Sequence, residues 1–246
     1  WELSVNWSDQ LKNGFSYGIG FNIFDYKAVV TKYNNPEGLI YNNHTGLVRN
    51  KGYYQGMDLG EIWGYEANDL FLTNKEVDEY LRGVEMYFFK QNRDWQRGDL
   101  KYIDSNGDGK IDPGSGTLKD HGDLKIIGNT TPRYSFGLNL HAGYKGFEVS
   151  ALFQGVMKRD IWLGGPMFWG ADGGEWQSVG FSEHLDYFRP ENTASVFGAN
   201  LDSYYPKAYL GDKGNKNKKT QTRYLQNGAY MRMKNLQIGY TFPRAW

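Results

Sequence analysis

The residue types best suited to chemistry occur together in one short acidic run, from Asp104 to Asp112. Oxygen-bearing side chains recur there at every second position, as in the first nine positions of a calcium-binding loop. Calcium is a hard cation that takes about six to eight oxygen ligands, and a glycine at the sixth position permits the sharp turn. The sequence therefore predicts a structural calcium site whose ligands are the side chains of Asp104, Asn106, Asp108 and Asp112 and the backbone carbonyl of Lys110.

The match ends before the twelfth position of that pattern. Ser115 stands where a complete site has a glutamate that binds calcium through both oxygens, and Pro113 and Gly114 end any helix leaving the loop. Asp120 or Asp123 could fold back to supply the missing ligand. The alternative is a turn whose Asp and Asn side chains bond their own backbone without a metal.

The sequence carries no recognisable catalytic motif. Its four histidines are dispersed without metal-site spacing, and it has no cysteine to act as a nucleophile or thiolate ligand. No P-loop occurs. We therefore predict no catalytic residue, no cofactor-binding residue and no enzymatic activity, although the many carboxylates leave room for a glycosidase pair.

Large aromatic residues gather among glycines in the second half of the chain. They could form a stacking platform for sugar rings, since exposed aromatics are common in binding sites. They could equally form the core of a loop or contact another protein. The candidate ligand-binding residues are Trp162, Phe168, Trp169 and Trp176.

The composition of the 246-residue chain favours β-structure. Aromatic residues make up 17% of it and glycine occurs 32 times, which suits strands joined by many turns. Lys and Arg balance Asp and Glu at 28 each, which argues against a dedicated nucleic-acid binder. No apolar run reaches the length of a membrane helix, but membrane-spanning strands need only about 9–11 residues and escape such a search.

Apolar and polar residues alternate in five segments, which predicts five strands. Between them lie two short turns and two long loops, 33–132 and 158–228. Thr73 and Glu76 form a capping box that predicts a helix in the first loop. A short helix is expected from Ser182, and the Gly-, Asn- and Lys-rich run 212–219 is expected to be mobile. The five alternating segments begin at Trp1, Phe15, Tyr134, Phe147 and Leu236.

The order of the connections is short, long, short, long. In an up-and-down sheet this places both long loops at one rim and both short turns at the other, as in outer-membrane barrels. Aromatic residues near the strand ends fit the membrane–water boundary, and the opposite faces are polar. A β-sandwich with one solvated face predicts the same alternation. The end aromatics are Trp1, Trp7, Phe15, Tyr134, Tyr144 and Phe147.

Several segments resemble TonB-dependent outer-membrane transporters of the SusC/RagA type. The most specific is Gly98–Asp112, which contains the acidic run, followed by Ile127–Tyr134. The others are Gly60–Tyr65 with Leu70 and Phe71, Tyr144–Phe147 with Phe153–Gly155, and Met231–Tyr240. Together these segments span most of the chain in the order of the family.

The resemblance implies an all-β fold, as part of a large antiparallel transmembrane barrel of about 22 strands with long extracellular loops carrying short helices. It implies the outer membrane of a Bacteroidetes-type bacterium, a SusD-like surface lipoprotein as partner, and energy from the TonB complex through a plug domain. The ligands of such proteins are oligosaccharides or peptides. The calcium-like run lies in an extracellular loop of these proteins.

We expect residues 1–246 to form about five strands of such a barrel, in contact with outer-membrane lipid, and to lack the plug domain, the TonB-contacting segment and the last strand. Five strands cannot close a barrel, because the smallest bacterial examples have about eight. Two other functions remain open at this point. The chain could be a secreted, calcium-stabilised glycan-binding β-module, or a β-rich glycoside hydrolase.

Overall fold

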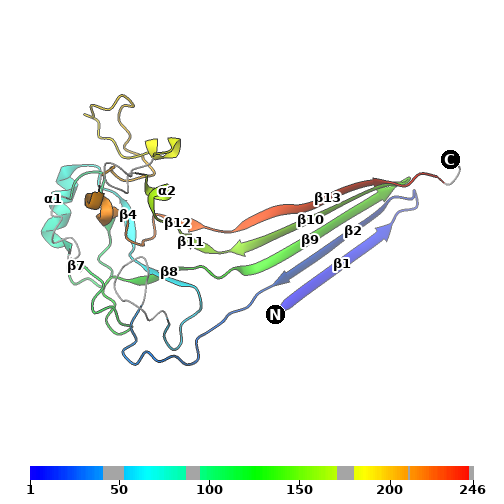
Figure 1. Ribbon diagram of the computed structural model, residues 1–246, viewed down its shortest axis with the longest axis horizontal. Helices are drawn as coiled ribbons and strands as arrows, with labels where there is room; N and C mark the ends of the chain where they lie inside the picture. Colours follow the sequence, from blue (N-terminus) through cyan, green and yellow to red (C-terminus); the bar gives the residue numbers. More distant parts are fainter. Residues whose placement is uncertain (41–52, 87–94, 171–179, 210, 244–246) are drawn as a thin grey trace.

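The computed structural model describes residues 1–40, 53–86, 95–170, 180–209 and 211–243. Two parts are evident in Figure 1. A long, twisted sheet occupies one side, and the two long connections between its strands fold together at one end of the sheet. We call this second part the loop body; it comprises the described residues of 25–132 and 159–229.

The sheet has five strands, and every neighbouring pair in it is antiparallel. Its order is β1-β2-β9-β10-β13, so the chain runs up and down through it without a crossover. This confirms the predicted all-β fold of five antiparallel strands. The strands are β1 (Glu2–Gln10), β2 (Ser16–Phe24), β9 (Arg133–Tyr144), β10 (Phe147–Lys158) and β13 (Tyr230–Tyr240).

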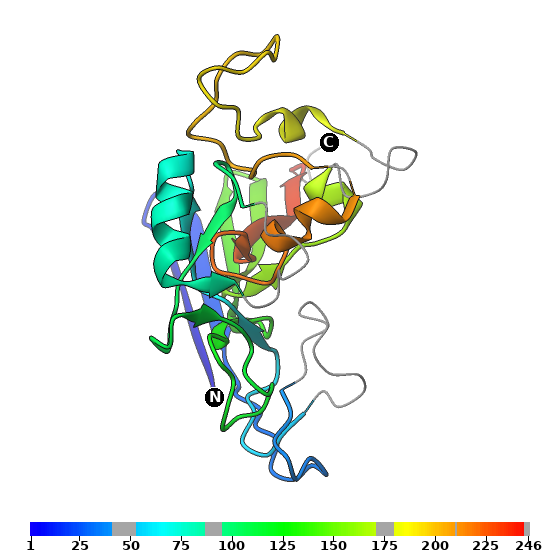
Figure 2. The ribbon, with the colours of Figure 1, turned by 90° about the vertical axis from the view of Figure 1, so that its left-hand side faces the viewer.

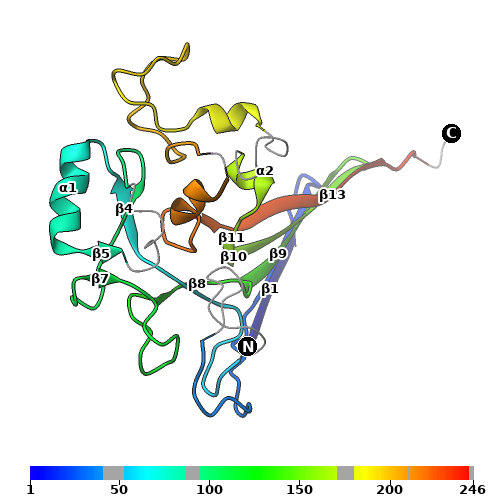
Figure 3. The same cartoon turned by 60° about the vertical axis from the view of Figure 1, so that its left-hand side comes forward.

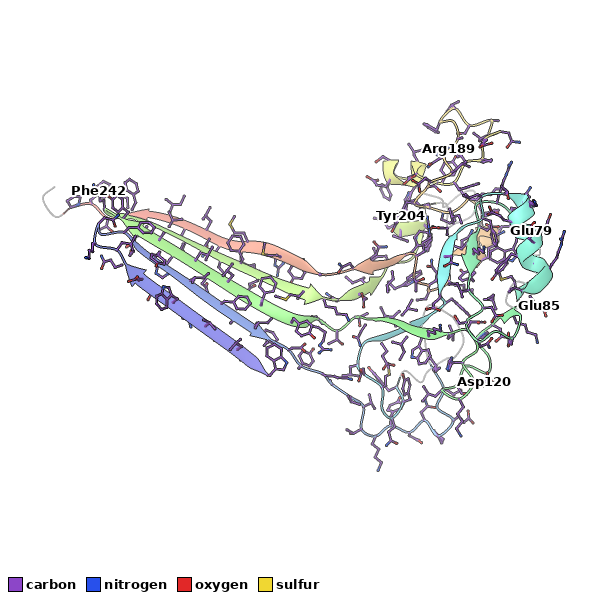
Figure 4. All side chains as sticks on the ribbon, turned by 180° about the vertical axis from the view of Figure 1, so that it is seen from behind. Glu79, Glu85, Asp120, Arg189, Tyr204 and Phe242 are labelled. Atoms are coloured by element: carbon purple, nitrogen blue, oxygen red, sulfur yellow. The ribbon has the colours of Figure 1, made fainter. Side chains whose placement is uncertain are left out.

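The two short connections lie at the end of the sheet away from the loop body (Figure 1). Lys145 and Gly146 join β9 to β10 with φ angles of 48° and 89°, and positive φ at both central residues matches the right-handed twist of a hairpin. The β1–β2 ladder continues to the pair Gln10 and Ser16, so residues 11–15 form the turn between these strands. Phe242, just beyond β13, lies at this same end (Figure 4).

The described residues of the first long connection form one helix and six short strands. Strand β3 pairs with β8 and β4 with β6, both antiparallel, whereas β5 and β7 run parallel. Figure 3 shows α1 on the side of the loop body away from the sheet. The elements are β3 (Glu61–Gly64), β4 (Ala67–Leu70), α1 (Asn74–Gly83), β5 (Glu85–Met86), β6 (Leu100–Tyr102), β7 (Lys110–Ile111) and β8 (Lys125–Asn129).

Helix α1 begins where the capping box predicts. The Thr73 hydroxyl accepts a hydrogen bond from the Glu76 N–H at 3.2 Å, which satisfies one of the free amides of the first turn. The Glu76 carboxylate reaches back to the Leu72 N–H at 2.9 Å, one residue before the usual partner. Val77 is buried, so the apolar stripe of the helix packs against the loop body.

The second long connection continues the β10–β13 ladder before it folds over the first. Strands β11 (Asp160–Trp162) and β12 (Leu225–Asn227) pair directly beyond that ladder. Between them the described residues include α2 (Pro166–Trp169) and the 3-10 helices η2 (Ser182–Leu185) and η3 (Gly211–Asn217). None of the described helices combines the length and the apolar character needed to cross a membrane.

Almost all buried apolar side chains of the described chain belong to the loop body. Val156 of β10 is the exception. Figure 2, seen from the loop-body end, shows both connections crowded around one centre. The body therefore folds around a core of its own, whereas the sheet has none. The core contains Ile40, Tyr54, Met57, Trp63, Tyr65, Leu70, Phe71, Val77, Met86, Trp95, Leu100, Tyr102, Ile111, Leu124, Phe188 and Tyr224.

The expectation that the run 212–219 is mobile is wrong for its second half. Lys216 and Asn217 are 2% and 1% exposed, although this stretch is rich in lysine, asparagine and glycine. The sequence of the run gives no sign of this burial, because the groups that accept its polar side chains lie more than a hundred residues earlier, around Asp99.

Candidate functional site

One face of the sheet is apolar across all five strands. The strand register places Trp7, Ile19, Leu140, Ala151 and Leu236 in one continuous row. Trp7 is 60% and Leu236 51% exposed. An apolar surface of this extent is unusual for a protein surrounded by water and marks a face that is covered by lipid or by another surface.

The opposite face is polar and rich in glycine. The next row across the sheet is Ser8, Gly18, His141, Ser150 and Gln237. A side chain at Gly18 would begin 2.0 Å from Cε1 of the His141 ring, so the glycine makes room for the imidazole. The same complementarity recurs between Gly20 and Asn6 and between Gly137 and Asn22.

Aromatic side chains pair at both ends of the apolar face. At the loop-body end the Trp1 and Tyr134 rings are 6.4 Å apart, and at the turn end the Phe147 and Tyr240 rings are 4.5 Å apart. Phe15 also lies beside Tyr144 at the turn end. Rings with one wet and one apolar side favour a membrane–water boundary, so two such belts fit a sheet that crosses a bilayer.

An ion pair between Arg133 and Asp25 lies at the junction between the sheet and the loop body. The Arg133 guanidinium donates from both Nε and Nη2 to the Asp25 carboxylate, at 2.5 Å each, and the Tyr134 N–H adds a third bond at 3.3 Å. These bonds, led by those from Arg133, lower the pKa of Asp25 to about 2. Asp25 follows β2 and Arg133 begins β9, so the pair closes the base of the first loop.

A buried ion pair joins the two loops within the body. The Lys216 ammonium lies 2.6 Å from an Asp99 carboxylate oxygen and also faces the rings of Trp95 and Tyr209, 5.3 Å and 4.5 Å from their centroids. Asn217 adds a bond from its amide to Asp99 at 2.9 Å. A charge this deep is costly unless paired and hydrogen-bonded, and here both conditions are met.

The predicted calcium ligands lie on one loop and bond its backbone. Asp104 accepts from the Gly107 and Gly109 amides at 2.7 Å and 2.8 Å, and Asp108 accepts from Lys110 N–H at 2.9 Å. The other predicted side chains do the same: Asn106 accepts from Asp108 N–H and Asp112 from Gly114 N–H.

The oxygen-rich donor set suits a hard cation in type and spacing, and each carboxylate retains further lone pairs. Within the described residues, however, no three His, Asp or Glu side chains converge on a point that could hold a metal. The hydrogen bonds present close the loop without an ion. Calcium at this loop therefore stays a prediction.

Asp123 holds the two ends of this loop together. Its carboxylate accepts from the Ser105 N–H at 2.7 Å and from the Asp112 N–H at 2.8 Å. Asp123 is 1% exposed, and its burial raises the pKa of this carboxyl above the ordinary value for aspartate. Asp120 lies apart from it and accepts from the Ser115 N–H at 2.9 Å.

Three of the four predicted ligand-binding aromatics pack within the loop body. Trp162, Phe168 and Trp169 lie partly buried against its core, and Trp169 meets Tyr224 with ring centroids 5.0 Å apart. Trp176 lies outside the described residues. Trp169, unlike Trp162 and Phe168, also lines a cavity within the second loop.

That cavity has a volume of about 310 Å³ and lies between η2, η3 and the segment 205–209. Aromatic rings and lysines line it, among them Trp169, Tyr187, Tyr205, Lys207 and Lys218. Of these residues, only Trp169 is predicted from the sequence as a ligand contact. The segment Tyr204–Tyr209, which contains three tyrosines and one lysine, is the sign that could have drawn attention to them.

Known proteins resemble the chain over its whole length, although no family model matches it. TonB-dependent receptor P3 of Formosa agariphila is 24% identical over 249 residues, which cover 100% of this chain and 22% of that protein. TonB-dependent receptor P26 of the same organism is 27% identical over 147 residues, 59% of this chain and 13% of that protein.

A solved structure, described as that of the RagAB peptide transporter, shares the fold. It superposes with a TM-score of 0.57 at 17% identity and covers 99% of this chain and 23% of that one. The chain thus spans about a fifth of the length of P3 and of the RagAB chain. These relatives are receptors and a transporter rather than enzymes, which supports the predicted absence of enzymatic activity.

Proposed function

We propose that this chain, which is part of a TonB-dependent transporter of the SusC/RagA type as its sequence predicts, forms a section of the barrel wall and outer mouth of a nutrient importer. The observation that carries the proposal is the two-sided sheet. Its exposed apolar rows suit contact with outer-membrane lipid, and its polar, glycine-rich rows suit a water-filled interior.

The open edges of the sheet support the same function. β1 and β13 are its two outer strands, and each has a row of backbone N–H and C=O groups on its outer side. In a bilayer each such group would cost several kcal/mol without a partner. Further strands of the complete protein would satisfy these groups and close the wall.

The loop body would form the substrate-facing mouth at the outer surface. Both long connections emerge from one end of the sheet, as the longer extracellular loops of outer-membrane barrels do. Its own core and the Asp99–Lys216 pair would hold the mouth in one shape before a ligand arrives. Preorganisation of this kind lowers the cost of binding.

The proposed cargo is an oligosaccharide or a peptide, and the proposed partner is a SusD-like lipoprotein that covers the mouth. The similarity to P3 and to the RagAB peptide transporter supports import with a partner of this kind. Energy would come from the TonB complex, acting on a plug that belongs to the complete protein. We place the complete protein in the outer membrane of a Bacteroidetes-type bacterium.

Calcium would be a structural ion of the mouth, held by Asp104, Asn106, Asp108, Asp112 and the carbonyl of Lys110. The support is the type and alternate spacing of these donors and the closure of the loop ends by Asp123. The backbone hydrogen bonds of the loop already hold its shape. A bound ion would in addition neutralise the negative charge of its carboxylates.

The test is uptake by cells that carry the complete protein. Membrane fractionation should place the protein in the outer membrane, and import of a labelled ligand should stop when TonB is deleted and resume on complementation. Co-purification should recover a lipoprotein bound to the loop-body side. A protein that remains in the soluble fraction without detergent, or uptake that persists without TonB, would rule the proposal out.

A further inference from the structure

We infer that the cavity of the second loop binds an acidic sugar unit, that is, a sugar ring bearing a carboxylate or a sulfate. This inference rests on the proposed function, because it names the class of cargo that the mouth would select. The cavity volume of about 310 Å³ is at the lower end of the range for small-molecule sites, which suits one or two rings.

The walls of the cavity offer flat apolar faces. Trp169, Tyr187 and Tyr205 all line it, and Tyr205 is itself braced by a stacked Tyr224, with centroids 6.4 Å apart and planes 18° apart. Rigid aromatic walls give a large contact area at little cost in side-chain entropy. The apolar C–H face of a sugar ring could lie against such a wall.

Two lysines give the cavity its preference for negative charge. Lys207 donates one hydrogen bond to the Gln96 side chain, and an ammonium group carries three donors, so two remain for a ligand. Lys218 lines the cavity beside Gly214, where a side chain would begin 3.3 Å from its Cε and 3.5 Å from its Nζ. The glycine thus leaves space for the ammonium end of Lys218.

The backbone around the cavity argues for a ring rather than an extended peptide. A peptide that adds to a sheet edge needs free main-chain donors and acceptors. Here the Tyr205 N–H donates to Asp186, its carbonyl accepts from Phe188, and the Lys207 N–H donates to Gly98. With these three backbone groups already bonded, recognition falls mainly to the side chains of the lining, in which aromatic rings and two ammonium groups stand beside His184 and Asn217.

The ion pair described above fixes the floor of this cavity. Asn217 lines the cavity while its amide donates to the buried Asp99 and its side-chain oxygen accepts from the Leu100 N–H at 2.9 Å. Lys218 is the next residue along the chain. The first loop thereby positions one of the two lysines that would meet the ligand.

The test is calorimetric titration of the complete, detergent-purified protein with defined probes. These are trigalacturonate, its neutral methyl ester, a galactotriose with one sulfate per ring, and triglutamate. We expect the two acidic sugars to bind at least tenfold more tightly than the ester, and the better of them identifies the acidic group. Tighter binding of triglutamate than of both acidic sugars would overturn the inference in favour of a peptide, and so would the absence of binding by any probe.

Variants locate the site. Lys207→Met and Lys218→Met should each weaken binding of the preferred acidic sugar about tenfold or more, because hydrogen bonds between charged groups contribute more binding free energy than neutral ones. Both variants should leave the weak binding of the ester unchanged. Tyr187→Ala should weaken both. Lys213→Met, an exposed lysine of η3, is the matched control and should change nothing. Equal effects of Lys213→Met and Lys218→Met would overturn the inference, whereas intact binding with failed uptake would count against the importer alone.

Discussion

The Lys216 ammonium and the Asp99 carboxylate meet at 2.6 Å in the interior of the loop body, with side chains 2% and 0% exposed. Asp99 belongs to the first long loop and Lys216 to the second. Asp99 also accepts hydrogen bonds from the Gln96 N–H and the Tyr209 hydroxyl. The two loops are therefore parts of one folded unit, and neither can rearrange without disturbing the other.

Removal of one partner of this ion pair should open the loop body. Asp99→Ala would leave the Lys216 charge buried without its counter-ion, and such losses cost about 3–5 kcal/mol. Hydrogen exchange of loop-body amides in the complete protein measures this change. The matched control is Asp69→Ala at the Asp69–Arg223 pair, where Asp69 is 91% exposed and the cost should stay below about 1 kcal/mol. Similar costs at both sites would contradict the role given to Lys216.

The contact between Asp25 and Arg133 should weaken in acid. The pKa of Asp25 falls from 3.8 to about 2 in the folded protein, so its ionised form favours the fold. That stabilisation is complete above pH 4 and is lost as the pH falls through 2. Hydrogen exchange at the Tyr134 amide reports on the contact. Asp25→Asn should exchange faster than the wild type at pH 5, and the difference should shrink towards pH 2. A difference that is constant over this range would contradict the assignment.

A Cβ at Gly18 would lie 2.0 Å from the His141 ring and would push this exposed ring aside. Gly18→Ala should therefore destabilise the wall by about 1 kcal/mol, the low end of the cost of overpacking. Gly239 lies in β13 with nothing within 4 Å of its Cβ position, so Gly239→Ala should be neutral there. Thermal unfolding of the complete barrel compares the two. Gly18→Ala combined with His141→Ala should recover most of the loss, and the absence of recovery would exclude this collision as the cause.

Calcium binding can be decided by metal content. If the proposal holds, the complete protein should retain about one calcium per chain after dialysis, and Asp104→Ala with Asp108→Ala should remove it. Asp69→Ala is a control because Asp69 is exposed and far along the chain from this loop. If the wild-type protein holds no calcium and a chelator does not change the melting of the loop, the backbone hydrogen bonds accepted by Asp104 and Asp108 suffice to hold the loop.

The sheet could be predicted from the sequence because its rules are local. Alternation with period two identifies each strand, and the two short turns force neighbouring strands to pair. The same reasoning places α1, since a capping box acts over four residues. The exact end of a strand is not local in this sense, because it depends on the register with the partner strand, in which Asp9 opposes Tyr17 and Gln10 opposes Ser16.

The loop body could not be predicted in this way, because its contacts join residues far apart in the sequence. No residue next to Lys216 in the sequence indicates that its side chain is buried. The burial results from contacts in the fold with Asp99, Trp95 and Tyr209. The cavity shares this origin, since its lining comes from several separate segments. Trp169 was predicted to contact a ligand. It packs against the core and also lines the cavity, and composition alone cannot distinguish these two positions.

Because the two loops share one core, they limit how the ligand specificity of such a mouth can evolve. If each loop were a separate appendage, either could be replaced alone to meet a new nutrient. Here Phe188 and Tyr224 of the second loop pack into a core built chiefly from the first. New specificity would therefore arise through small substitutions at the cavity lining, or through exchange of both loops as a set, while the strands beneath stay as they are.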